Sequence, residues 1–167
     1  MKSWLTGLIF LMGSMVMPAV AQDSNVYYGI GFSDGGLQVP GNGSRNVGTL
    51  AASVGYQFSD RIGLELAFGA GSDEASSIFS DSLVQYQAGL LRLSHFWSNK
   101  QVYLLLGHAR LDVDSRLNPV HAGNAFGLGI NLFGSPQLAI NANFLNLAGG
   151  EFTTASIGIQ YFIGGVR

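Results

Sequence analysis

Three histidines and a small set of acidic residues are the side chains of this 167-residue chain that could do chemistry. A histidine beside a serine and a carboxylate could activate the hydroxyl as a nucleophile for hydrolysis. The histidines stand in the sequences His95-Phe96-Trp97, His108-Ala109-Arg110 and His121-Ala122-Gly123. Ser76 or Ser77 could approach His108 in space, but nothing in the spacing selects either serine. The pattern predicts loop or interfacial histidines and no enzyme.

Metal and cofactor sites are also not indicated. There is no cysteine, which excludes disulfides and cysteine-based metal sites. Asp112-x-Asp114 could contribute oxygens to Ca²⁺ or Mg²⁺ but lacks the rest of an EF-hand loop. No helix follows Gly29-x-Gly31 or Gly127-x-Gly129 to cradle a phosphate. We expect no cofactor and no metal. The net charge of −2 without a basic stripe argues against nucleic-acid binding.

The first 21 residues have the anatomy of a secretory signal peptide. Lys2 gives a positive start, an apolar run covers residues 5–17, Pro18 ends it, and Ala19-Val20-Ala21 is a small-x-small cleavage site. A membrane-spanning helix is the alternative, but the run is shorter than the ~20 residues that a span needs. We predict residues 1–21 as the signal peptide and residues 22–167 as one domain. An exported chain without cysteine points to a bacterial envelope.

After residue 21, the dominant hydrophobic period is two, which is the signal of a β-strand. Alternation is clean near residues 26–33, 49–58, 62–69, 125–132, 140–144 and 157–163, and weaker at 83–95 and 101–111. We therefore predict eight strands.

The two faces of these strands suggest a barrel in a membrane. One face carries large apolar residues, while the other carries Gly, Ala, Ser, Thr, Asn, Gln and a single Glu. A soluble sandwich would place Lys, Glu and Asp on its outer face. A small, nearly uncharged face suits the narrow interior of an eight-stranded barrel whose apolar face meets lipid.

The connections alternate in length, as they do in outer-membrane barrels. Long polar connections are expected near residues 34–46, 70–82 and 112–122, and short ones near 59–61, 98–100 and 134–137. With an even strand count, both termini then lie in the periplasm.

Aromatic residues gather at the predicted periplasmic strand ends. An aromatic girdle at headgroup depth explains this clustering, because amphipathic rings prefer the bilayer interface. The predicted girdle comprises Tyr27, Tyr28, Tyr56, Phe58, Trp97, Tyr103, Phe133 and Tyr161.

Together these features resemble the small eight-stranded outer-membrane β-barrels, the OmpA/OmpX-like superfamily with its opacity-type porin members. The segments that carry the resemblance are residues 26–31, 55–58, 126–130 and 156–162, read as VYYGIG, GYQF, FGLGI and SIGIQYF. The resemblance implies an all-β, antiparallel, up-and-down transmembrane barrel. The family usually ends with a terminal aromatic on the apolar face, whereas Phe162 lies on the opposite parity here.

Glu65 is the charged residue that alternation places inside the barrel. An unpaired carboxylate in a narrow interior is costly, so we expect Arg92 as its partner if the fourth strand carries a bulge near residues 90–92. Without a bulge, Arg92 would share the presumed lipid-facing parity of Val84, Tyr86 and Ala88 and would lie at the periplasmic rim.

The function expected from the sequence is structural, or an interaction at the cell surface through the outer loops. The alternatives are a small low-conductance channel, a lipid A-modifying enzyme and a soluble periplasmic ligand-binding barrel. The resemblance to lipid A deacylase barrels fails because the His-x-Ser step is absent. Expected partners are outer-membrane lipid, lipopolysaccharide and the barrel-assembly machinery, with the chain as a monomer.

Overall fold

The computed structural model describes residues 26–39, 43–73, 83–113 and 120–164; the predicted signal peptide lies outside these ranges. The elements are β1 (Val26–Val39), β2 (Gly43–Gln57), β3 (Ile62–Asp73), β4 (Leu83–Trp97), β5 (Lys100–Val113), β6 (His121–Phe133), β7 (Leu138–Leu147), a 3₁₀ turn η1 (Ala148–Gly150) and β8 (Phe152–Phe162).

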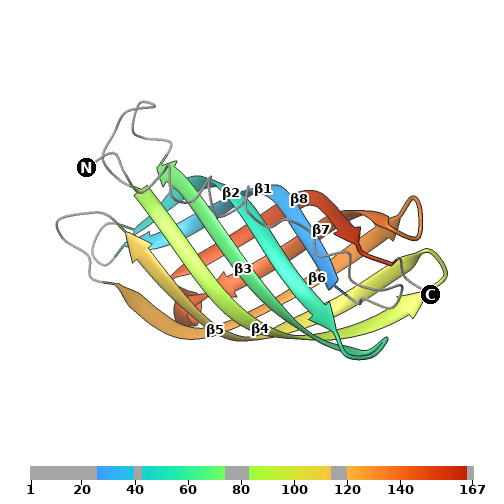
Figure 1. Ribbon diagram of the computed structural model, residues 1–167. Coiled ribbons are helices and arrows are strands. Elements are labelled where there is room, and N and C mark those ends of the chain that lie inside the picture. The colour runs from blue at the N-terminus through green and yellow to red at the C-terminus, as the bar shows by residue number, and fades with distance from the viewer. Residues whose placement is uncertain (1–25, 40–42, 74–82, 114–119, 165–167) are drawn as a thin grey trace, which may run out of the picture.

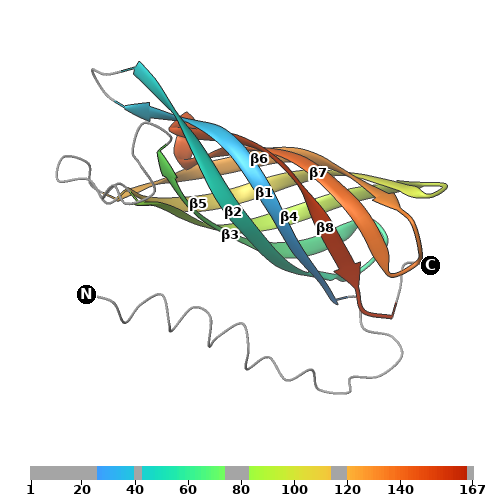
Figure 2. The same ribbon diagram turned by 90° about the horizontal axis from the view of Figure 1, so that it is seen from above.

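The eight strands form one closed antiparallel barrel in sequence order, as predicted (Figures 1 and 2). Closure is made by β1 and β8, where Tyr27 lies opposite Phe162. Because every strand has two neighbours, no edge offers unpaired backbone groups to another chain or to lipid. None of the helices in the described part of the chain is long and apolar enough to cross a membrane.

The large apolar face of the strands points outward. Ile30, Phe32, Leu50, Leu128 and Ile157 are each more than half exposed, although they are among the most hydrophobic residues of the chain. In water such a surface would drive association, whereas in a bilayer it is the lipid-facing band. The outward orientation rules out the soluble barrel with an apolar interior face that the sequence left open.

At the end of the barrel with the short turns, the band is bordered by outward aromatic rings. This aromatic edge consists of Tyr28, Tyr56, Phe58, Trp97 and Tyr161. Trp97 is 76% exposed, and Tyr56 packs edge-on against Phe58. The first residue of β1, Val26, and the last residue of β8, Phe162, both lie at this same end of the barrel.

Three residues of the predicted girdle were wrongly placed. Tyr27 and Tyr103 are buried inside the barrel, and Phe133 packs against the buried ring of Phe162. Successive strand residues point to opposite faces, so Tyr27 and Tyr28 could not both face lipid. These residues lie at the correct end of their strands but on the inward face, which position along the strand alone does not reveal.

At the opposite end, outward side chains change from apolar to polar on most strands. This polar edge consists of Asp34, Gln87, His108, Asn124, Asn146 and Thr153. On β5, for example, outward Val102 and Leu106 precede His108, Arg110 and Asp112. The polar edge therefore marks the other limit of the lipid-facing band.

The strands continue beyond the polar edge, which shortens the connections expected there. Residues 34–39 and 43–46 were predicted within a loop, but residues 34–39 pair with residues 43–48 as the end of the β1–β2 hairpin. Polar residues hid this extension because a strand with water on its outer face does not need apolar alternation there. The connections at residues 74–82 and 114–119 lie outside the described residues.

Candidate functional site: a charged network inside the barrel

The barrel interior brings Glu65 and Arg92 together. Glu65 lies opposite Leu90 in the β3–β4 register, so Arg92 is its diagonal neighbour on the same face. Arg92 Nη1 donates to Glu65 Oε2 at 2.8 Å, and the two side chains are 0% and 4% exposed.

No bulge is needed for this contact, because the β3–β4 and β4–β5 ladders run without interruption past Arg92. The presumed parity was wrong: Val84, Tyr86 and Ala88 are buried in the interior together with Arg92. The outward positions of β4 instead include Gln85 and Gln87 at the polar end, and these polar residues obscured its alternation.

Two tyrosines enclose the guanidinium of Arg92. Its Cζ lies 3.6 Å from the ring centroid of Tyr103 and 4.7 Å from that of Tyr27. Tyr27 also donates its hydroxyl to Glu65 Oε2 at 2.6 Å. Cation–π contact and the shared carboxylate thus replace the hydration that both charges lose on burial.

Each of these tyrosines lies over a glycine directly opposite it in the ladder. Tyr27 on β1 lies opposite Gly55 on β2, and Gly55 lies opposite Glu65 on β3. Because Gly55 has no side chain, the tyrosine ring can extend across β2 to the carboxylate. Tyr103 crosses Gly129 in the same way. A Cβ at either glycine would clash with the Cζ and the hydroxyl oxygen of the tyrosine opposite it.

Amide side chains complete the network around the charges. Gln101 Oε1 accepts from Arg92 Nη2 at 3.0 Å and from Asn131 Nδ2 at 2.8 Å. Asn131 also donates to Gln160 Oε1 at 2.7 Å, and Asn141 donates to the Tyr103 hydroxyl at 2.5 Å. The network therefore links β1, β3, β4, β5, β6, β7 and β8 through side chains alone.

An aromatic floor closes the interior at the end with the short turns. Tyr27, Ala139 and Phe162 form a buried cluster against which Phe133 packs. The rings of Phe133 and Phe162 are 5.3 Å apart, and those of Tyr27 and Phe162 are 5.2 Å apart. The inward parity of Phe162, read from the sequence as a departure from the family, places its ring in this floor.

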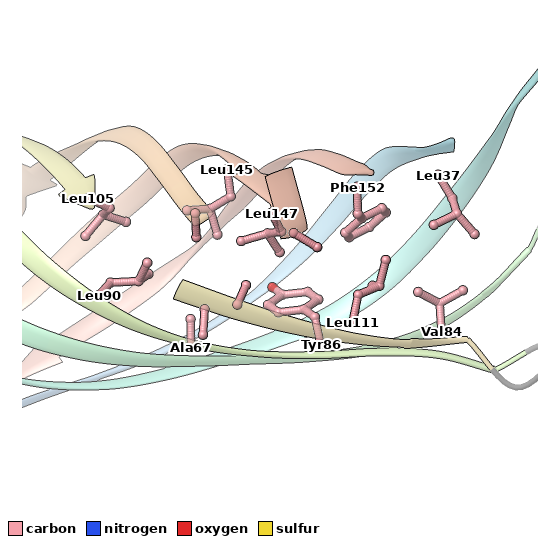
Figure 3. Close-up of a cluster of buried hydrophobic side chains, with 14 of the residues drawn as sticks. Leu37, Ala67, Val84, Tyr86, Leu90, Leu105, Leu111, Leu145, Leu147 and Phe152 are labelled. Carbon is pink, nitrogen blue, oxygen red and sulfur yellow. The ribbon is translucent and has the colours of Figure 1, made fainter. Parts of the chain in front are cut away.

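Toward the polar edge, the interior is filled by a second, larger apolar cluster (Figure 3). Tyr86 and Phe152 pack with their ring centroids 6.0 Å apart. Leu111, Leu147 and other buried residues surround them, and all eight strands contribute to the cluster. The expectation of a uniformly small and polar interior was therefore wrong. The charged network lies between the two apolar clusters, and the further buried polar side chains Ser33, Thr49 and Thr154 lie on β1, β2 and β8.

The three histidines occupy different surfaces. His95 and His108 are exposed on the outer wall, and His121 lies at the polar end, where its Nδ1 is 2.9 Å from Glu151 Oε2. Within the described residues, no serine or threonine hydroxyl is hydrogen-bonded to this pair. Groups of three or more potential metal ligands are likewise not found among the residues described.

Comparison with protein-family models matches residues 6–161 to the outer membrane protein beta-barrel domain. The chain belongs to this family. It is a β-barrel of the bacterial outer membrane. A search of curated protein sequences gave no significant match.

Solved structures share the architecture at low sequence identity. Neisserial surface protein A is 14% identical, with a TM-score of 0.64 over 83% of this chain and 97% of that one. Ail, the attachment invasion locus protein of Yersinia pestis, is 15% identical, with a TM-score of 0.58 over 84% and 98%. OprG from Pseudomonas aeruginosa is 14% identical, with a TM-score of 0.54 over 86% and 99%. At such identities the likeness shows the fold alone.

Replacing Glu65 with Gln should destabilise the barrel, because Arg92 would remain buried without a counter-charge. Loss of one partner of a buried ion pair costs about 3–5 kcal/mol. Urea unfolding of the refolded barrel, followed by Trp97 fluorescence, measures the change. A double variant, Glu65→Leu with Arg92→Met, should lose less than the sum of the two single variants. Asp60→Asn in an exposed turn is the control, and equal stability of Glu65→Gln and this control would contradict the expectation.

Gly55→Ala and Gly129→Ala should each displace a tyrosine ring from Arg92. Overpacking of this kind costs about 1–3 kcal/mol. The same unfolding assay tests the effect, with Gly134→Ala as the matched control, because a Cβ there would meet nothing within 4 Å. Identical midpoints for all three variants would show that the glycines are not required by the rings.

Proposed function

We propose that this protein is a non-enzymatic outer-membrane barrel whose role is structural or is exerted at the cell surface, through the end that bears the polar edge. The observation that carries this proposal is the filled interior. The aromatic floor, the charged network and the apolar cluster succeed one another along the barrel axis. A protein with a closed interior acts through its outside.

A channel is the weaker alternative for the same reason. A cavity of about 30 Å³ lies beside Glu65, lined also by Ser53, Asn141 and Gln160. Such a space accommodates one or two water molecules but no continuous column. Eight-stranded barrels have an interior just wide enough to be filled by side chains, and Arg92, Tyr103 and Tyr86 fill this one.

The proposed orientation places the aromatic edge and both termini in the periplasm. Outer-membrane barrels have short periplasmic turns and longer connections outside, and the three short turns here share one end with Val26 and Phe162. Lipopolysaccharide would then surround the polar edge. The barrel-assembly machinery is the partner expected during biogenesis, and the closed ladder is consistent with a monomer.

Purified protein in planar lipid bilayers should give no stepwise current, because the interior is blocked at three levels. Single-channel recording measures this directly, with a trimeric porin in the same bilayers as the positive control. Regular conductance steps that persist after repurification would overturn the filled-interior argument and favour the channel.

A short epitope inserted within residues 74–82, between β3 and β4, should be labelled by antibody on intact cells. The same epitope in the turn at residues 134–137, between β6 and β7, should be labelled only after the outer membrane is permeabilised. Flow cytometry compares the two insertions. The reverse pattern would place the termini outside and contradict the proposed orientation.

A further inference from the structure

The outer wall of the barrel carries a local group of side chains with N–H donors at the polar edge: an arginine, a histidine and two amides. His108 and Arg110 follow each other on the outward face of β5, and both are exposed. Gln87 on β4 lies directly opposite Arg110, and Asn124 on β6 lies directly opposite His108. We call these four residues the β5 patch.

The β5 patch continues directly from the lipid-facing surface. On the same face, Leu106 precedes His108 along β5, and Phe126 follows Asn124 along β6; both are more than 40% exposed. Gly89 lies opposite His108 and presents no side chain there. A molecule bound at the patch would therefore have hydrogen-bond donors at one end and apolar side chains at the other.

Elsewhere along the polar edge, the described side chains offer different chemistry. Asp34 on β1 is acidic, and Asn146 on β7 donates to Thr153 on β8 at 3.1 Å. Among the outward side chains of the polar edge that the structure describes, the guanidinium of Arg110 on β5 carries the positive charge. The attraction for an anion is accordingly localised on one sector of the wall.

We propose that the β5 patch binds the phosphate of a membrane lipid whose acyl chains lie against Leu106 and Phe126. Arg110 supplies a planar fork of N–H donors that suits phosphate oxygens, and His108, Gln87 and Asn124 add N–H donors beside it. Asp112 lies two residues farther from the lipid-facing band than Arg110, so its carboxylate does not stand between the guanidinium and the lipid.

The amphipathic arrangement favours a lipid over a soluble anion, because a soluble anion would leave the apolar side chains of Leu106 and Phe126 without an apolar contact. In the orientation proposed above, on which this assignment of leaflet rests, the lipid is the phosphorylated glycolipid of the outer leaflet. The binding chemistry itself does not depend on the leaflet.

Native mass spectrometry tests the proposal on the purified protein in a non-ionic detergent, titrated with diphosphoryl lipid A. One lipid A should remain bound per barrel. Arg110→Gln should weaken this binding about tenfold, since a hydrogen bond to a charged group contributes that much. Lys100→Gln removes the same charge from an exposed residue at the other end of the barrel, and its affinity should equal that of the unmodified protein.

Three results would overturn the proposal: equal affinities for Arg110→Gln and Lys100→Gln, equal binding of lipid A that lacks its phosphates, or equally tight binding of inorganic phosphate alone. The comparison between phosphorylated and phosphate-free lipid needs no variant, so it remains decisive if a substitution impairs folding. If lipid A does not bind and the bilayer recording shows no current steps, the lipid site is wrong and the proposed function stands. If lipid A binds but the epitope labelling is reversed, the site stands and only its assignment to the outer leaflet changes.

Discussion

The buried pair of Glu65 and Arg92 is the constraint around which the interior is organised. Two charges removed from water must recover several kcal/mol each through contacts with one another and with polar groups. The structure supplies these contacts from three further strands, β1, β5 and β8: two tyrosine faces, one tyrosine hydroxyl and the carboxamide oxygens of Gln101 and Gln160. Glycines are placed where the rings must pass. The polar layer thus dictates residue choices well beyond the two charged positions.

Apolar layers on either side make that arrangement more demanding and more effective. They limit the access of water to the ion pair, which strengthens its attraction and raises the cost of any unpaired partner. They also leave little free volume, because the floor and the larger cluster interdigitate with the network. A barrel built in this way is rigid and closed, and its chemistry with the environment is confined to its wall and its ends.

Much of the fold could be predicted from the sequence, because period-two alternation over a long chain has few solutions. The eight strands, the short turns and the outward apolar face follow from it. It was harder to predict which residues face the interior where polar residues stand on the outer wall, as at Gln85 and Gln87 on β4. On such a strand the apolar residues of the alternation point into the barrel and not toward lipid. Length was underestimated for β1 and β2, whose ends extend past the lipid-facing band.

For the site, Glu65 and Arg92 could be named, but their contact depends on a strand register that the sequence does not state. The roles of Tyr27 and Tyr103 needed that same register, because a tyrosine opposite a glycine is recognisable only when the partner strand is aligned.

The position of the ion pair within the chain has a consequence for assembly. Glu65 and Arg92 belong to adjacent strands, β3 and β4, whereas Tyr27 and Gln160 come from the two ends of the chain. Within the β3–β4 hairpin, the interior acid and base are therefore matched diagonally across a single ladder. Tyr103 and Gln101 reach Arg92 from the neighbouring strand β5, Tyr27 reaches Glu65 across β2, and Gln160 reaches Arg92 from β8. Charge neutralisation is therefore local in the sequence, so the two interior charges do not depend on closure of the barrel for their counter-charge.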